Sequence, residues 1–305
     1  MKTVFLFVLV LISLGCRGHA DPAFVLILGV AQDGGYPHIG CFKACCLPAL
    51  TNHDLKKFAV SFALVDPVAK KWWLFEATPD IKEQLQYFKA QTHSEYAYLP
   101  DGIFITHAHI GHYTGLMQLG FEAMNTKGVG VYVLPKMSKF LRINGPWSQL
   151  VTLKNIEIRT LTTNALLKIS DNVEVSAFTV PHRNEFSETA GFHIKTSAKT
   201  YLFIPDIDKW EKWDKDIRKE VEQVDVALLD ATFSSAMELP GREIKEVPHP
   251  FVRETVELFH NKDIKARERI FFIHFNHTNP LLWDVEEQKP IQKKAFNVAS
   301  QGMRL

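Results

Sequence analysis

The sequence predicts an α/β (α+β) protein folded as a four-layer αββα sandwich, with a functional site at one edge of its two sheets. Short apolar segments alternate with helical segments in two successive strand-rich halves, and several strands end on a histidine or an aspartate. The chain of 305 residues is 46% hydrophobic and can bury a large core. No linker, repeat or low-complexity run divides it, so one domain is expected over residues 21–305.

Residues 1–20 have the pattern of a signal peptide: Lys2, an apolar run at 4–14, and the cleavage site Gly18-His19-Ala20. The apolar run is too short to span a bilayer comfortably. A competing pattern that ends at Cys16 resembles a bacterial lipobox, which would attach a lipid there and anchor the protein to a membrane. We therefore expect an exported protein, periplasmic or secreted, that is either soluble or a membrane-anchored lipoprotein.

The mature chain is expected to begin with a buried strand at residues 24–30, which Asp33-Gly34-Gly35 converts into a loop. One histidine and three cysteines follow closely in this loop: His38, Cys41, Cys45 and Cys46. Three thiolates and one imidazole form a tetrahedral ligand set for a structural zinc ion. The alternative is one disulfide and one free thiol, because three cysteines cannot all pair within one chain.

A hairpin and a helix are expected next. Residues 57–65 and 71–75 are two strand-like runs separated by a turn, and residues 81–90 form an amphipathic run. Thr78 stands where an N-cap is expected, and Pro79 stands at the first helical position. These signals predict that the helix begins close to the end of the hairpin.

A dense histidine cluster follows a buried strand that ends at Thr106. His107, His109 and His112 place three imidazoles within six positions. His107 and His109 can point the same way from an extended segment, while His112 precedes a helix expected at residues 113–124. Because imidazole is the commonest protein metal ligand, the cluster predicts a metal site where the strand opens into a loop.

The second half of the chain supplies further strands with polar ends. Alternating apolar and polar residues between positions 150 and 180 predict a second sheet, whose last strand stops just before His182. A hairpin within residues 191–204 then leads to Asp206. Both side chains are therefore expected at the edge of this second sheet.

Four more polar residues occupy strand ends or helix starts. Asp208 is expected to cap a helix at residues 210–221. The next buried strand ends on Asp230, which either orients a histidine from outside the metal ligands or lies in a turn. His249 either lines the same cleft or caps the helix that follows it, and the last apolar strand ends on His274.

The charge balance bears on the class of partner. Lys and Arg number 35 against 34 for Asp and Glu, and no basic block is present. This balance excludes a basic surface for nucleic acid. We expect a small-molecule substrate, and no sequence feature indicates an oligomeric state.

The segment from His107 to His112 resembles the HxHxDH signature of the metallo-β-lactamase superfamily, with Gly111 in place of the usual aspartate. The resemblance implies the αββα fold of that superfamily. It also implies zinc at the active site, with iron or manganese as alternatives. Because Gly111 offers no carboxylate, the second metal position lacks one ligand, and either one or two ions are expected.

The same resemblance assigns roles to residues elsewhere in the chain. It implies that one ion is held by three histidines, His107, His109 and His182. It implies that a second position is served by His112, Asp206 and His274. Asp206 would also orient the nucleophile, and His277 would either replace the side chain missing at Gly111 or form a hydrogen bond in the pocket.

Blocks outside this signature resemble the pyrroloquinoline-quinone biosynthesis protein B group, and they include residues 28–35, 77–81, 229–233 and 274–280. The leading expectation is an exported metal-dependent hydrolase in which metal-bound hydroxide attacks an ester, an amide or a phosphoester. The resemblance to this group also implies an alternative, an iron-dependent oxygenase that uses His112, Asp206 and His274. A third possibility is a non-catalytic protein that binds a metal or ligand.

Overall fold

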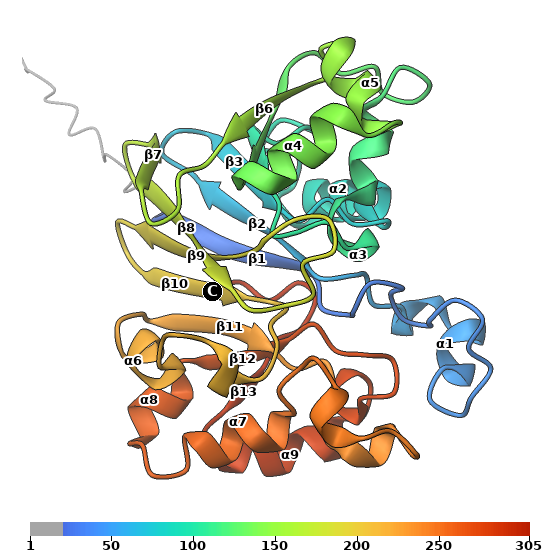
Figure 1. Cartoon of the computed structure of the whole chain (residues 1–305), viewed down its shortest axis with the longest axis vertical. Coiled ribbons are helices and arrows are strands. Elements are labelled where there is room, and N and C mark those ends of the chain that lie inside the picture. Colours follow the sequence, from blue (N-terminus) through green and yellow to red (C-terminus); the bar gives the residue numbers. More distant parts are fainter. Residues whose placement is uncertain (1–20) are drawn as a thin grey trace, which may run out of the picture.

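The computed structural model describes residues 21–305, and it contains two facing β-sheets with helices on both outer surfaces (Figure 1). This arrangement is the predicted αββα sandwich. The predicted signal peptide and the lipobox at Cys16 lie outside the described residues. Within the described part of the chain, no helix is both long enough and apolar enough to cross a bilayer.

The first sheet has six strands: β1 (Phe24–Gly29), β2 (Ser61–Asp66), β3 (Lys71–Phe75), β4 (Gly102–Phe104), β5 (Val129–Val133) and β6 (Ile156–Thr160). Strands β1 to β3 pair antiparallel, and β3 to β6 pair parallel. Our assignment of residues 156–158 to the second sheet was wrong. Helices α4 (Pro135–Ile143) and α5 (Trp147–Thr152) return the chain so that β6 joins β5 in parallel.

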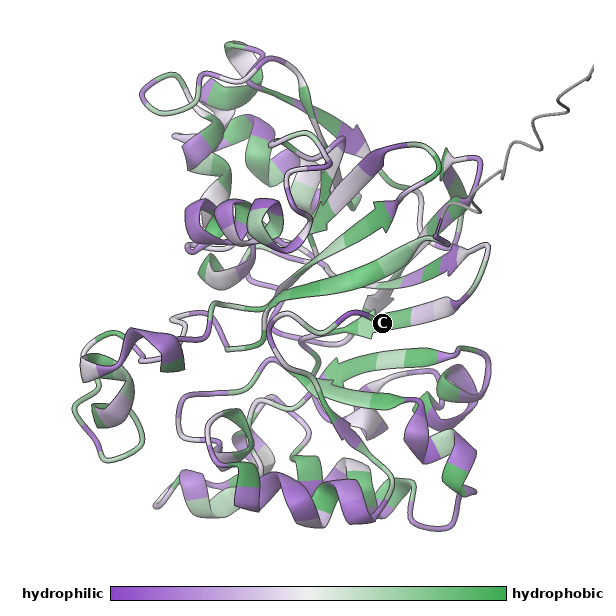
Figure 2. Cartoon of the chain, turned by 180° about the vertical axis from the view of Figure 1, so that it is seen from behind, coloured by the Kyte–Doolittle hydropathy of each residue, from purple (hydrophilic) through white to green (hydrophobic). Residues whose placement is uncertain are grey.

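The second sheet has seven strands: β7 (Leu166–Ser170), β8 (Val173–Val180), β9 (Thr189–Thr196), β10 (Thr200–Ile204), β11 (Val226–Asp230), β12 (Ile270–Ile273) and β13 (Asn297–Val298). Its helices are α6 (Ile217–Glu222), α7 (Val252–Leu258), α8 (Ile264–Glu268) and α9 (Val285–Lys293). Figure 2 shows mainly hydrophobic strands between helices of mixed polarity. Helix α1 (Leu47–Thr51) lies on an arm that projects from one side (Figure 1).

Neighbouring residues of the first sheet enter two different cores, because side chains alternate along a strand. Trp72 packs outward, and its ring stacks 3.9 Å from the ring of Phe88 on helix α2 (Ile81–Gln91). Trp73 packs inward, between the two sheets. A row of inward aromatic rings crosses the sheet with centroid distances of 4.4, 4.7 and 4.5 Å, formed by Phe62, Phe75, Phe104 and Tyr132. This packing holds the two sheets together beside the predicted site.

The helix that follows the histidine cluster is shorter than predicted. Instead of a helix over residues 113–124, the chain forms α3 (Ile110–Tyr113) and the 3₁₀ helix η2 (Thr114–Leu119). Gly115 explains the change, since a Cβ atom there would lie 2.1 Å from the backbone oxygen of Thr78. The backbone of Gly115 therefore packs directly against residues 77 and 78, which precede α2, and His112 lies in a short helical turn just before it.

One predicted helix cap is present and one is wrong. Helix α2 has Asp80 at its N-cap position without a side-chain cap, and the predicted cap, Thr78, accepts a hydrogen bond through Oγ1 from the backbone N–H of Asp80. The helix expected from residue 210 to 221 is a short 3₁₀ turn followed by α6, which Asp216 caps. Asp208 is therefore free of the capping role that the sequence suggested.

Candidate metal centre

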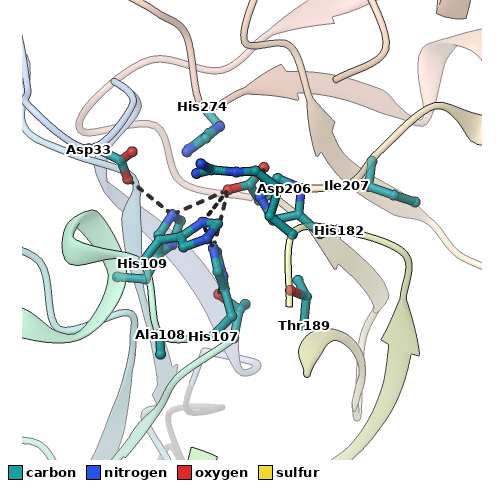
Figure 3. A network of polar contacts seen from close by, with 12 residues as sticks. Asp33, His107, Ala108, His109, His182, Thr189, Asp206, Ile207 and His274 are labelled. Carbon is teal, nitrogen blue, oxygen red and sulfur yellow. Dashed lines mark hydrogen bonds and ion pairs between the residues drawn. The ribbon is translucent and has the colours of Figure 1, made fainter. Parts of the chain in front are cut away.

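Histidine and aspartate side chains from separate strand ends meet at one edge of the sandwich (Figure 3). The loop after β4 carries His107 and His109, and α3 carries His112. The second sheet adds three residues that follow β8, β10 and β12 respectively, namely His182, Asp206 and His274. The structure thus brings all six predicted ligands to the same place.

The first group contains His107, His109, His182 and Asp206, whose candidate ligand atoms all lie within 4.8 Å of one another. Asp206 Oδ2 is 3.3 Å from His107 Nε2 and 4.0 Å from His109 Nδ1. Asp206 Oδ1 is 3.2 Å from His182 Nε2. His182 Nε2 and Asp206 Oδ1 are buried and have no hydrogen-bond partner among the described residues. Three imidazoles and one carboxylate suit a tetrahedral zinc ion or a related divalent ion.

The second group lies on the other side of Asp206. His112 Nε2 is 3.7 Å from Asp206 Oδ2, and the His112 and His274 rings are 5.3 Å apart. Asp33, which the sequence analysis did not single out, places its Oδ1 atom 3.4 Å from His112 Nε2. The sequence could not predict that this turn aspartate contacts His112, because the two residues lie in segments far apart in the chain.

Each of the five histidines presents one nitrogen to the cluster, while the other nitrogen lies beside a different polar side chain. The distances from these outer nitrogens to the neighbouring oxygens run from 2.9 to 3.6 Å. The pairs are His107 with Thr106, His109 with Glu185, His112 with Glu76, His182 with Asp208, and His274 with Thr232. Such outer contacts orient metal-binding imidazoles. Asp208, which was predicted to cap a helix, instead contacts the outer nitrogen of His182. No feature of the sequence had indicated Glu76 or Glu185.

Two of these residues have an uncommon backbone conformation. Glu76 has φ of 71° and His274 has φ of 67°, in the left-handed region that non-glycine residues rarely adopt. Each immediately follows a buried strand, β3 or β12. The turn aims the side chain back into the cluster, and such conformations concentrate at functional sites.

Asp230 and His249 form a buried pair beside the cluster. Asp230 Oδ2 is 2.9 Å from His249 Nδ1, and Asp230 Oδ1 accepts hydrogen bonds from Thr232, which in turn contacts His274. His249 Nδ1 also lies 3.2 Å from Asp206 Oδ1. Asp230 thus contacts residues of the site that it can orient, and His249 lies within the cluster beside Asp206 and Asp230.

The electrostatics favour an ionised carboxylate among the histidines. Burial alone would raise the pKa of Asp206, but the imidazoles of His182 and His249 lower it well below its ordinary value. Burial also works against a charged His112, yet the carboxylates of Glu76 and Asp33 raise its pKa well above the usual value. Asp206 is therefore charged, as a metal ligand must be.

The cysteine loop gathers a different histidine from the one predicted. Cys41, Cys45 and Cys46 are free thiols, and their fourth neighbour within 4.8 Å is His277. His38 instead contacts the backbone oxygen of Ile39 at 2.8 Å, and its ring packs 4.4 Å from that of His277. The structure thus does not bring His38 into the group of cysteines, and it places His277 there instead of beside His112.

The protonation state of His277 suits this new position. Burial, together with the nearby His38 and Lys43, lowers the pKa of His277 to about 4. The imidazole is consequently neutral at neutral pH, as ligation requires. Sequence distance explains the error, because His38 is adjacent in the chain whereas His277 arrives from the loop after β12.

Comparisons with known proteins identify the family and agree with the fold. Residues 71–275 match the family described as Beta-lactamase superfamily domain. The chain is 24% identical to coenzyme PQQ synthesis protein B of Methylorubrum extorquens, covering 92% of this chain and 99% of that protein. The crystal structure of Zn²⁺-bound PqqB from Methylobacterium extorquens superposes with a TM-score of 0.73 at 21% identity, covering 92% and 99% of the two chains. A diphosphatase from the PhnP family gives 0.66 at 19% identity, covering 94% and 98%.

We predict that the cysteine group binds one zinc ion through His277 and independently of His38. In protein purified under reducing conditions, His277→Ala should lose one equivalent of zinc by elemental analysis, because it removes the fourth ligand. The matched variant His38→Ala should retain that equivalent. The opposite pattern, loss with His38→Ala and retention with His277→Ala, would contradict the assignment.

Proposed function

The chain belongs to the metallo-β-lactamase superfamily and resembles PqqB over nearly its whole described length, and we propose a function from this premise. We propose that the protein is a metal-dependent hydrolase. The proposed substrate is a small molecule with an ester, amide or phosphoester bond. One observation carries the proposal: three imidazoles and a carboxylate offer their ligand atoms within 4.8 Å of one another in a buried cluster. The similarity to a diphosphatase of the PhnP family supports hydrolysis.

His107, His109, His182 and Asp206 would hold the ion, and their outer contacts keep each ring in a ligating orientation. A bound divalent ion would lower the pKa of a water molecule towards about 7 and would polarise the bond to be cleaved. Asp206 supplies two oxygens that face different histidines, so it would also accept a hydrogen bond from that water and hold it in line with the substrate.

His249 is the residue that we assign to the leaving group. Its Nδ1 atom is bonded to Asp230, and its Nε2 atom has no hydrogen-bond partner among the described residues. Burial disfavours the imidazolium, but the carboxylates of Asp230 and Asp206 raise the pKa of His249 above its usual value. A protonated His249 would therefore donate from Nε2 to the departing oxygen or nitrogen.

An oxidative reaction is the second candidate. His112, His274 and one carboxylate form the two-histidine, one-carboxylate set that suits ferrous iron and dioxygen. The full-length similarity to coenzyme PQQ synthesis protein B, a biosynthetic protein by name, favours keeping this candidate. Oxygen uptake by anaerobically iron-loaded protein with phenolic compounds separates the two reactions, since a hydrolase consumes no oxygen.

We also propose that the protein acts outside the cytoplasm, on the strength of the apolar run at residues 4–14. Mass spectrometry of the processed protein should show a chain that begins at residue 21. A chain that begins at Cys16 with an attached lipid would establish the lipoprotein alternative, and an uncleaved chain that starts at Met1 would contradict export.

We predict that replacing His107 and His109 together by alanine removes the ion of the first group and abolishes turnover, because two of its four ligands are lost. The measurement is elemental analysis alongside hydrolysis of a panel of p-nitrophenyl esters and phosphodiesters. The zinc of the cysteine group should remain, which confirms that the variant is folded. Full metal content in the double variant would rule out this ligand assignment.

We predict that His249→Ala lowers kcat by about 10²–10⁴, the usual contribution of a general acid, while leaving the metal content unchanged. The loss should be large for substrates with a poor leaving group and small for p-nitrophenyl substrates, whose leaving group needs no proton. His260→Ala, at a largely exposed position, is the control. An equal loss for both substrate types would argue for a structural role of His249.

A further inference from the structure

The second histidine group has a carboxylate that the sequence signature does not supply. Asp33 lies in the loop after β1, and its Oδ1 atom is 3.4 Å from His112 Nε2. Figure 3 shows Asp33 on the side of the cluster away from Asp206. Asp33, His112 and His274 offer ligand atoms that all lie within 4.8 Å of one another. We propose that Asp33 replaces the aspartate absent at position 111 and completes a second metal position with His112 and His274. This inference rests on the proposed metal-dependent function.

Gly111 is the steric counterpart of Asp33. A Cβ atom built on Gly111 would lie 2.0 Å from Asp33 Oδ1 and 2.5 Å from Asp33 Cα. The backbone of Gly111 does not adopt a positive φ, so the glycine is required for space and not for conformation. A side chain at position 111 would therefore collide with the backbone of residue 33 as well as with its carboxylate, so the loop that carries Asp33 requires glycine at position 111.

Unpaired polar atoms converge on the space between the three residues. Asp33 Oδ1, His112 Nε2 and His274 Nε2 are all buried without a hydrogen-bond partner among the described residues. The outer nitrogens of the two imidazoles lie beside Glu76 and Thr232. Two imidazole nitrogens and a carboxylate oxygen that lie together without partners are what a bound cation would satisfy.

The loop of Asp33 is attached to the segment that carries His274. Gln32 donates its backbone N–H to the oxygen of Phe275 at 2.8 Å, and its side chain accepts a hydrogen bond from Asn276 at 2.6 Å. Gly35 closes the turn with φ of 67° and a hydrogen bond to the Gln32 oxygen. These hydrogen bonds position Asp33 and His274 relative to each other, although the two residues are 241 positions apart in the sequence.

Asp206 lies between the two positions. Its Oδ2 atom is 3.3 Å from His107 in the first group and 3.7 Å from His112 in the second. With Asp33 as a ligand, the second group would have a carboxylate of its own beside His112 and His274. The structure therefore favours two ions at the centre, despite the glycine in the signature.

Metal stoichiometry tests the inference. After loading with Mn²⁺ or Zn²⁺ and removal of free ions, the wild-type centre should hold two equivalents besides the zinc of the cysteine group. Asp33→Asn should hold one, because the amide removes the charge at nearly constant shape. In the Mn²⁺-loaded protein, the spin-coupled signal of a metal pair should give way to that of an isolated ion. Asp171→Asn changes an exposed aspartate with no contact to the site and should keep both.

A second variant displaces the carboxylate without changing any candidate ligand. Gly111→Ala places a methyl group where Asp33 lies, so it should also lose the second equivalent and keep the first. Retention of the zinc bound by the cysteines shows that a variant is folded. If Asp33→Asn does not fold, Asp33→Ser takes its place in the experiment. Two ions in a folded Asp33→Asn, Asp33→Ser or Gly111→Ala variant, or one ion in the wild-type centre, would overturn the inference. A wild-type centre without any metal would instead overturn the proposed function.

Discussion

The site is organised by one buried carboxylate. Asp206 is 3% exposed and lies within 4.0 Å of five imidazoles that come from both halves of the chain, namely His107, His109, His112, His182 and His249. A lone buried charge is unfavourable, so its neighbours must compensate it. The two sheets supply these neighbours because their strand ends meet at a single edge. Packing of the aromatic rows between the sheets thus determines how closely the ligands can approach.

Much of this arrangement could be predicted from the sequence. His182, Asp206 and His274 each follow an apolar strand, and a polar residue at such a place is exposed to the sheet edge where clefts form. What failed were inferences from nearness in the chain. His38 is next to the cysteines in sequence, yet His277 reaches them in space. Asp208 precedes a helical segment, yet it contacts His182.

The residues that were missed share a physical reason. Glu76, Glu185 and Asp33 have no periodicity or spacing that distinguishes them from ordinary surface or turn residues. Their importance arises from contacts with histidines at least 30 positions away, such as Glu76 with His112 at 3.6 Å. The helix after the cluster was misassigned for a similar reason, since the constraint on Gly115 is the backbone of Ala77 and Thr78. Local propensity cannot register a neighbour from another part of the chain.

The loop after β12 links the two groups of candidate ligands. Within four residues it contributes His274 to the metal centre, Asn276 to the loop of Asp33, and His277 to the cysteine group. The loop after β1 is fastened at the same two places, through Asp33 at the centre and through Cys41, Cys45 and Cys46 beyond it. A zinc ion held by the cysteines and His277 would therefore tie the loop after β1 to the loop after β12. The cysteine group would then have no chemical step of its own, and it would reinforce the hydrogen bonds of Gln32 that position Asp33 beside His274.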